Sequence, residues 1–212
     1  MAGDVGPEGA MDAFESPETT REEILAAAYR ALCTHGYAEL TVERIGEEFD
    51  KSVSLIYHHY SGKDELLLAC LDFMLEQYAT ETGSDGISDP RAELEALCDR
   101  VTLADAPAEH REFMRSLAGL RGQATHDAAF REYFTRSDGF FRGQLTAIVE
   151  AGIETGAFRD VDVERTVAMI QTVFSGALFR YATSDDDEWL SAVRRELYAY
   201  LEERLYRPAE ST

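Results

Sequence analysis

The sequence predicts an all-α protein in which three short N-terminal helices are followed by a larger helical part. Three observations favour this fold class. Serine and threonine residues precede amphipathic segments at the spacing of helix N-caps, apolar residues recur every three or four positions, and glycine and proline mark the breaks. The 212 residues, 45% of them hydrophobic, suffice for one large or two small domains with an apolar core.

The N-terminal segment changes character near residue 17. Residues 1–16 carry four acids, glycine and proline without an apolar period, so we expect a flexible acidic arm. Thr19 and Thr20 each stand three residues before a glutamate, which is the spacing of a capping box. They predict a first helix that ends at Gly36, a residue typical of helix C-termini.

Two further short helices fit between residues 41 and 60. Thr41 is a suitable cap for the first of them, and Ser52 for the second, after a turn at Asp50 and Lys51. One stripe of the second of these helices is expected to pack inward and consists of Val53, Ile56, Tyr57 and Tyr60. The opposite face carries side chains suited to reaching into a groove, namely Lys51, Ser54, Leu55, His58 and His59.

The chain has two lysines among its 20 basic residues, and both flank this outward face. Ser61 is expected to cap the next helix with Asp64 at its third position, which places Lys63 in the first turn. A cation there opposes the helix dipole unless an anion lies nearby. A DNA phosphate is one such anion, and Asp64 or another neighbouring acid is the alternative.

The stretch TVERIGEEFDKSVSLIYHHYSGKDEL resembles the helix-turn-helix and following helix of the tetracycline-repressor (TetR) family of transcriptional regulators. The matching residues are Thr41, Ile45, Phe49, Ser52, the run 56–60, Lys63 and Leu66, and the resemblance extends from Thr20 to Leu66. It implies that the third helix enters the DNA major groove, that Tyr57 and Lys63 touch phosphates, and that Thr41 meets the backbone. The expected DNA-binding residues are Thr41, Lys51, Ser52, Ser54, Leu55, Tyr57, His58, His59 and Lys63.

The turn departs from the family pattern in two places. Lys51 stands where an apolar residue is usual and Asp50 where glycine is common, and we expect Lys51 to point outward to DNA. For His58 and His59, stacking or solvation is the alternative to DNA contact. Adjacent histidines point in different helical directions, which disfavours a shared metal site, so no metal is expected.

The net charge of −21 is unusual for a DNA-binding protein, because acidic surfaces repel phosphate. Residues 17–65 alone contain five basic and ten acidic residues, a net charge of −5, so few phosphate contacts and a shallow salt dependence are expected. A strongly acidic chain in which arginine nearly replaces lysine resembles the proteins of salt-accumulating organisms. Molar salt shortens the Debye length to about 3 Å, so a halophilic origin would reconcile the charge with DNA binding.

The predicted domains are a DNA-binding domain at 17–62 and an effector-binding and dimerisation domain at 63–212. The second begins with an apolar connecting helix from Lys63 to about Tyr78, followed by helices at about 91–105, 109–123, 126–155, 162–184 and 187–206. Apolar side chains that could surround a small, largely apolar effector are Cys70, Met74, Met114, Leu117, Phe134, Phe141 and Phe174. Core packing is the commoner role for such residues. Arg115, Arg121, Arg131 and Arg142 are candidates for binding an anionic effector, although such arginines usually lie on solvated faces.

The last two helices each carry a wide apolar stripe. The family resemblance implies that they form a four-helix interface in a homodimer and separate two recognition helices by roughly 34–36 Å. The expected interface residues are Val167, Ile170, Leu178, Leu190, Val193, Leu197 and Leu201. A monomeric bundle that closes on itself is the alternative.

Other classes of protein find little support. The sequence has no glycine-rich phosphate loop after a strand, no G-x-S-x-G and no catalytic pair, so we expect neither an enzyme nor a cofactor. Cys33, Cys70 and Cys98 are expected to be small buried hydrophobes. No run is long enough to span a membrane and residues 1–16 lack the basic start of a secretory signal, which predicts a cytoplasmic protein.

The predicted function is therefore that of a homodimeric transcriptional regulator, most simply a repressor, that binds double-stranded operator DNA through the helix at 52–60. A small-molecule effector would shift the connecting helix and move the two DNA-reading helices out of register. A helical ligand-binding or interaction protein with weak or no DNA binding is the alternative.

Overall fold

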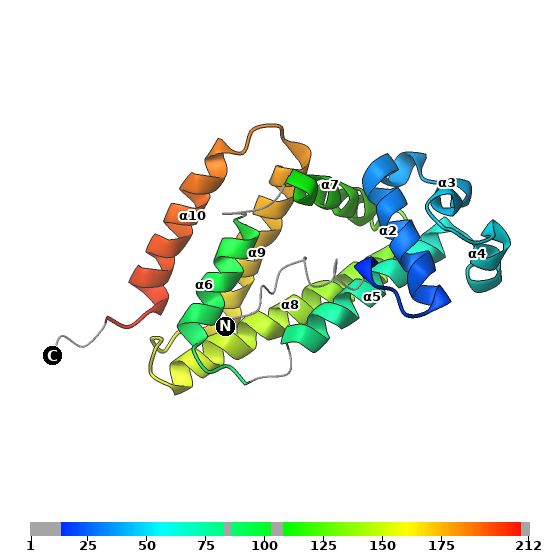
Figure 1. Ribbon diagram of the computed structural model, residues 1–212. Coiled ribbons are helices and arrows are strands. Elements are labelled where there is room, and N and C mark those ends of the chain that lie inside the picture. Colours follow the sequence, from blue (N-terminus) through cyan, green and yellow to red (C-terminus); the bar gives the residue numbers. More distant parts are fainter. Residues whose placement is uncertain (1–13, 83–85, 103–107, 209–212) are drawn as a thin grey trace. The chain divides into compact units, whose positions relative to one another are not determined.

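The computed structural model describes residues 14–82, 86–102 and 108–208 (Figure 1). These residues form α-helices and one short π-helix, and no β-strand occurs among them. The elements are α2 (Thr20–Glu39), α3 (Val42–Glu47), α4 (Val53–His59), α5 (Lys63–Thr82), α6 (Pro90–Val101), α7 (Ala108–Gln123), α8 (Ala128–Glu154), α9 (Val163–Thr183), α10 (Glu188–Tyr200) and the π-helix η1 (Leu201–Leu205). The all-α fold class is confirmed.

The described residues divide into two compact units. The first comprises 14–82 and 115–135, and the second comprises 86–102, 108–114 and 136–208. Helices α7 and α8 thus contribute to both units. Because the first unit contains all of α5 as well as α2–α4, it extends beyond the segment 17–62 that the sequence suggested as the DNA-binding domain.

The helix starts in the first unit follow local capping chemistry. Thr19 and Glu22 form a reciprocal capping box, and the hydroxyls of Thr41 and Ser52 cap α3 and α4 as predicted. Gly36 has φ = 66°, a conformation that glycine adopts without strain, and the chain kinks there before a last turn to Glu39.

The start of α5 differs from the prediction. Ser61 does not cap with Asp64. Instead, the backbone amide and hydroxyl of Ser61 both donate to the carboxylate of Glu65, which lowers the pKa of Glu65. The carboxylate of Asp64 accepts a hydrogen bond from the hydroxyl of Tyr37 in α2 at 3.0 Å.

The first unit packs around α2, which is buried between Ile24 and Leu32 except at Arg30. Ile24, Ala28 and Leu32, which recur at helical spacing along α2, are each at most 3% exposed. Phe14 is also buried, because its ring stacks on Tyr29 of α2 at 5.0 Å and lies 5.4 Å from Phe73 of α5. The expected flexible arm is therefore wrong at its C-terminal end, where an aromatic anchor joins it to the fold; residues 1–13 lie outside the described part.

Three hydrogen bonds fasten elements of the first unit that are far apart in sequence. The thiol of Cys70 in α5 lies 3.7 Å from the carbonyl oxygen of Leu25, and the hydroxyl of Ser116 in α7 donates to Leu32 at 3.1 Å. The hydroxyl of Tyr133 in α8 donates to the carbonyl of Leu71 at 3.1 Å. Helices α5, α7 and α8 are thus joined to α2 or to one another.

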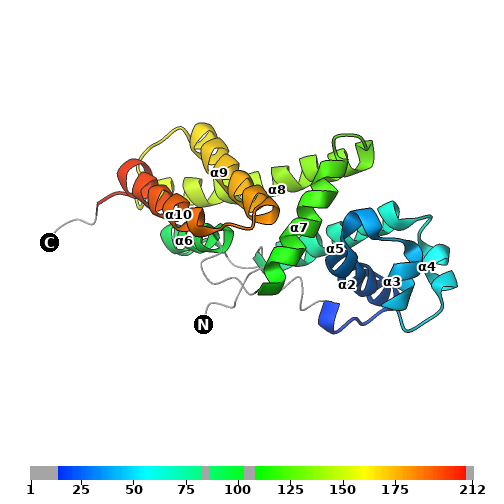
Figure 2. The ribbon, with the colours of Figure 1, turned by 90° about the horizontal axis from the view of Figure 1, so that it is seen from above.

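The second unit has its own apolar core. Helix α6 packs against both α9 and α10 (Figures 1 and 2). Asp99 of α6 accepts hydrogen bonds from Arg194 at 2.7 Å and from Tyr198 at 2.6 Å, so a charged cluster also joins α6 to α10. At the end of η1, the ring of Tyr206 stacks on Phe158 at 5.3 Å, and both side chains are at most 1% exposed.

Candidate DNA-binding site

Apolar packing against α3 fixes the position of α4. Ile45 of α3 and Ile56 of α4 are at most 1% exposed, and Tyr60 after α4 is 8% exposed. The two helices approach closely at Gly46, where a Cβ atom would lie only 2.4 Å from Cγ2 of Val53. These contacts make α3, the turn and α4 a helix-turn-helix.

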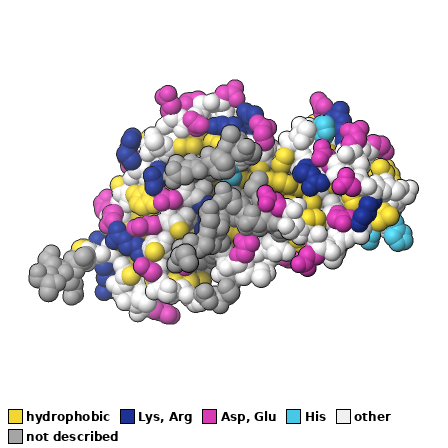
Figure 3. Space-filling model, viewed as in Figure 1, with side chains coloured by type: hydrophobic (Ala, Val, Ile, Leu, Met, Phe, Trp, Pro, Cys, Tyr) yellow, Lys and Arg dark blue, Asp and Glu magenta, His cyan; other side chains and the backbone are white. Residues whose placement is uncertain are grey.

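The opposite face of α4 is open to solvent. Ser54, His58 and His59 are exposed and Leu55 is half-buried, as predicted for side chains that read base edges. The two histidine rings lie edge to face at 5.5 Å. Tyr57 is 52% exposed, so the prediction that it packs inward with Ile56 was wrong. Its hydroxyl is accessible enough for the expected contact with a phosphate. On the face shown in Figure 3, basic side chains lie scattered among acidic ones.

The hydroxyls of Tyr57 and Thr41 share a carboxylate neighbour. Tyr57 donates a hydrogen bond to Oε1 of Glu43 in α3 at 3.2 Å. Hydrogen bonds from the backbone amide of Glu43 and from the hydroxyls of Thr41 and Tyr57 lower the pKa of this carboxyl group. The same contact raises the pKa of Tyr57, because a nearby negative charge disfavours the phenolate.

Lys51 is expected from the sequence to point outward to DNA, but in the structure it contacts α2. Its ammonium group forms an ion pair with Glu23 of α2 and lies 3.4 Å from the hydroxyl of Thr20. The Lys51 side chain is nevertheless 45% exposed, so the pair is accessible to solvent. Surface pairs of this kind contribute little to stability, roughly 0–1 kcal/mol.

Lys63 has a different environment from the one expected. Its ammonium group donates to the carbonyl oxygens of Tyr37 at 3.1 Å and Leu40 at 3.0 Å, and it lies 4.3 Å from the centre of the Tyr37 ring. These carbonyls belong to the C-terminal end of α2, where the helix dipole is negative. They supply a negative partner for Lys63 within the protein, and the contact joins the start of α5 to the end of α2. Contact of Lys63 with a DNA phosphate stays a prediction.

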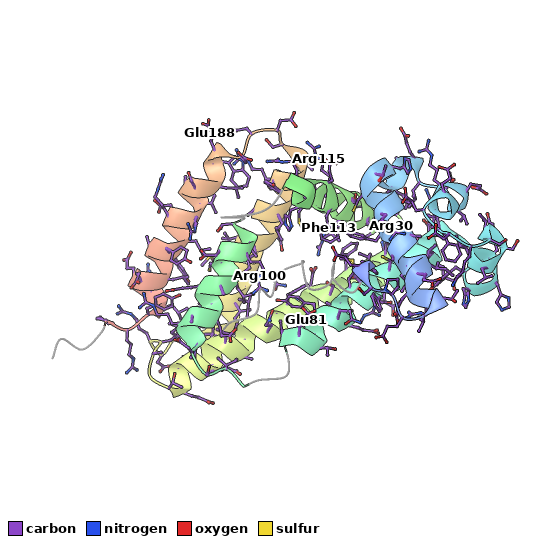
Figure 4. All side chains as sticks on the ribbon, in the orientation of Figure 1. Arg30, Glu81, Arg100, Phe113, Arg115 and Glu188 are labelled. Atoms are coloured by element: carbon purple, nitrogen blue, oxygen red, sulfur yellow. The ribbon has the colours of Figure 1, made fainter. Side chains whose placement is uncertain are left out.

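Two arginines near the helix-turn-helix are also held by acids. Arg44 of α3 forms an ion pair with Glu39 at 3.0 Å. Arg30, labelled on α2 in Figure 4, donates to the carbonyl of Glu48 at 2.8 Å and lies 3.5 Å from its carboxylate. Both lysines and these two arginines of the first unit thus have intramolecular partners.

The expected effector-binding residues are divided between the two units. Cys70, Met74, Leu117 and Phe134 lie in the first unit, and Met114, Phe141 and Phe174 lie in the second. Most are buried, but Phe141 is 37% exposed and the thiol of Cys70 faces α2. Of the four arginines considered for anion binding, Arg121 lies over the ring of Phe134 at 4.6 Å and Arg131 donates to the carbonyl of Ala124.

The expected interface residues also differ in their exposure. Four of them lie in the core of the single chain, namely Val167, Ile170, Leu197 and Leu201, each at most 4% exposed. Such side chains have no surface left for a partner, so their assignment to an interface was wrong. Leu190 is 8% exposed, Leu178 and Val193 are half-buried, and the large apolar side chain that α9 exposes is Phe179, at 54%.

Metal-binding clusters and membrane-spanning helices are both absent from the described ranges. No group of three or more histidine, cysteine or acidic side chains is arranged to hold a metal ion. None of the helices described combines the length and apolar character that crossing a membrane requires.

The fold and the open face of α4 define a class of protein, the helix-turn-helix DNA-binding proteins with an additional helical part. Residues 24–70 match the sequence model for bacterial regulatory proteins of the tetR family, and residues 90–206 match the model for the C-terminal part of BetI-type transcriptional repressors. The chain therefore belongs to the TetR family of transcriptional regulators.

Individual relatives agree with this assignment. The chain is 28% identical over 182 residues to the HTH-type transcriptional repressor AcnR of Corynebacterium glutamicum, an alignment that covers 85% of this chain and 92% of AcnR. A TetR transcription regulator from Haloarcula marismortui is 36% identical with a TM-score of 0.78, over 87% of this chain and 97% of that one. A regulator from Saccharomonospora viridis, solved in complex with choline, shares the fold at 18% identity and a TM-score of 0.72, over 89% and 98% of the two chains.

Three residues of this site were not among those expected from the sequence. Gly46 was not singled out, although a glycine inside a short helix is a signal of close backbone approach. Glu43 and Glu23 were not recognised as partners of Tyr57 and Lys51. Glu43 and Tyr57 are 14 positions apart and on different helices, so their contact depends on the tertiary fold.

The two lysines provide a matched pair for a stability test. We expect Lys63→Ala to lower the free energy of unfolding by about 1–3 kcal/mol, because two carbonyl groups at the end of α2 lose a charged donor. Lys51→Ala should change it by less than about 1 kcal/mol. Chemical denaturation monitored by circular dichroism checks both values, and equal effects would contradict the positioning role of Lys63.

Proposed function

We propose that this chain represses transcription by binding operator DNA as a homodimer through α4 and that a small molecule releases it. The observation that carries the proposal is the α4 helix, which is packed on α3 through Ile56 while Ser54, His58 and His59 remain exposed. Side chains near the start of a recognition helix contact base edges in the major groove. Since the operator is chromosomal DNA, the protein acts in the cytoplasm.

The dimer contact is proposed at the exposed face of α9. Phe179 lies on this face with the small or polar residues Thr172, Ser175, Gly176 and Thr183, all exposed. A second copy related by twofold symmetry would cover Phe179 with the same surface of its own α9. The partly exposed Leu178 and Val193 of α9 and α10 would border this contact.

The effector is proposed to be small and largely apolar, with at least one polar group. Its support comes from the second unit, where Met114 and Phe174 are buried apolar side chains. His110, one helical turn before Met114 on α7, is 7% exposed, and its Nε2 atom has no hydrogen-bond partner among the described residues. A polar group of a ligand would satisfy this nitrogen.

An origin in a high-salt environment is proposed from the charge. The net charge of −21 and the use of only two lysines support it, as does the similarity to the Haloarcula marismortui regulator. At molar salt, repulsion between exposed acids is screened within about 3 Å.

Replacement of Ser54 tests the DNA-binding face. We expect Ser54→Glu to weaken specific binding of a fragment upstream of the protein's own gene by roughly 10–100-fold, because it places a carboxylate against base edges and phosphates. Thr135→Glu, at an exposed hydroxyl of α8, adds the same charge and should have little effect. Fluorescence anisotropy in molar potassium salt measures both, and equal affinities of the two variants would exclude α4 as the reading helix.

The dimer proposal is tested at Phe179. We expect Phe179→Asp to raise the dimer dissociation constant at least roughly 30-fold, because twofold symmetry brings two carboxylates together in an apolar contact. Phe141→Asp, at the 37% exposed aromatic of α8, should leave the dimer intact. Light scattering during size-exclusion chromatography distinguishes them, and a Phe179→Asp dimer of unchanged stability would rule out this interface.

The high-salt proposal makes a prediction about folding. We expect the thermal midpoint to rise as potassium chloride increases from about 0.1 M to about 2 M, since screening removes repulsion among the acids. A gain of about 3 kcal/mol corresponds to roughly 6–12 °C for a chain of this size. Calorimetry in salt, compared with sucrose of equal osmolality, checks it; equal stability in dilute and molar salt would count against a halophilic origin.

A further inference from the structure

One acid lies directly beside the expected phosphate contacts of the helix-turn-helix. The hydroxyl of Tyr57 donates to Glu43 at 3.2 Å, and Tyr57 is 52% exposed on the proposed DNA-binding side of the unit. Glu43 is in the first turn of α3, two positions after Thr41, and its side chain is exposed. The inference that follows rests on the proposed function.

The donors around Glu43 are the kind of groups that bind phosphate oxygens. The hydroxyl of Tyr57 donates a hydrogen bond to its carboxylate, and the hydroxyl of Thr41 and the backbone amide of Glu43 also lower its pKa. Hydroxyls and backbone amides make a large share of protein contacts to DNA phosphates. An exposed glutamate is an anion at neutral pH, and these groups lower the pKa of Glu43 further.

We propose that the Glu43 carboxylate occupies, in the free protein, the place at Tyr57 that a DNA phosphate oxygen takes in the complex. Operator binding then requires Tyr57 to exchange one anionic acceptor for another. The displaced carboxylate stays close to the phosphate because it is attached to α3. Glu43 therefore sets the affinity for operator DNA and how that affinity depends on salt.

The second contact of the same kind supports this view. Lys51, also expected to contact DNA, is held by Glu23 in the free protein. A lysine that leaves a carboxylate for a phosphate makes one ion pair and breaks another. Binding of the lysine releases one counterion from the DNA, and the freed carboxylate takes up one cation from solution. The net number of ions released is close to zero, so such contacts add little to the salt dependence of operator affinity.

Salt concentration should control the size of the Glu43 effect. The Debye length falls from about 10 Å at 0.1 M to about 3 Å at 1 M, so repulsion between the displaced carboxylate and the phosphate is strong in dilute salt and weak in molar salt. Replacing Glu43 by glutamine keeps the shape and one acceptor oxygen but removes the charge.

The experiment compares Glu43→Gln with Glu47→Gln by fluorescence anisotropy on the operator fragment, at about 0.1 M and about 1 M potassium chloride. Glu47 lies one turn further along α3 and is exposed, and its side chain makes no hydrogen bond or ion pair within the described part of the chain. Both changes remove one negative charge from the same helix. We expect Glu43→Gln to tighten binding by roughly tenfold at the lower salt, clearly more than Glu47→Gln, and the difference to shrink at the higher salt.

A double-mutant cycle shows whether the effect passes through Tyr57. In a Tyr57→Phe background, which lacks the hydroxyl, the advantage of Glu43→Gln over Glu47→Gln should largely disappear. Both glutamates are exposed, so the variants should fold, which circular dichroism verifies.

The outcomes separate the inference from the function on which it rests. Wild-type protein that binds no operator fragment would overturn both. Wild-type binding with equal gains from the two glutamine variants, or a loss of affinity in Glu43→Gln, would overturn only the role of Glu43.

Discussion

The close approach of α3 and α4 at Gly46 is the constraint on which the rest of the DNA-binding site depends. No Cβ atom fits between the Gly46 backbone and Val53, where the separation would be 2.4 Å. This contact, with the buried side chains of Ile45 and Ile56, determines which face of α4 is turned inward. It leaves Ser54 on the open side. A rotation of α4 about its own axis would exchange the apolar side chains for polar ones, so the packing of α3 selects the reading face.

The electrostatics of this unit differ from those of a protein that attracts DNA by a basic patch. Lys51 is paired with Glu23, Arg44 with Glu39 and Arg30 with Glu48, so the positive groups contribute little long-range field. Attraction at a distance raises association rates, whereas short-range contacts determine which sequence is bound. For a chain with a net charge of −21, recognition therefore depends on contacts made within a few ångströms, and salt lowers the cost of bringing the two acidic partners together.

The fold could be predicted from the sequence because its signals are local. Caps at Thr19, Thr41 and Ser52, together with apolar periods, fixed the helices to within a few residues. The exposed residues of α4 followed from the same periodicity. The partners of the charged side chains could not be predicted, because they lie far along the chain: Lys63 reaches carbonyls 26 and 23 positions earlier, and Lys51 reaches an acid 28 positions earlier. The burial of the apolar stripes of α9 and α10 could not be predicted either, because it depends on the packing of α6 against both helices within the same chain.

The hydrogen bonds along α2 suggest how a change in α5 reaches the reading helix. The carbonyl of Leu25, in the second turn of α2, accepts from Cys70 of α5. The carbonyls of Tyr37 and of the C-cap Leu40, at the end of α2, accept from Lys63 of α5. Because α2 is bonded to α5 at two positions along its length, we expect the two helices to move together as a rigid unit. Sliding of one helix along the other would break both sets of contacts. Since α3 begins directly after Leu40, a displacement of α5 is passed to α3 and, through Gly46, to α4. A ligand that favours one position of α5 would then change operator affinity by its differential binding energy for the two positions. Lys63 thus joins the connecting helix α5 to α2, the helix that leads into the DNA-binding pair.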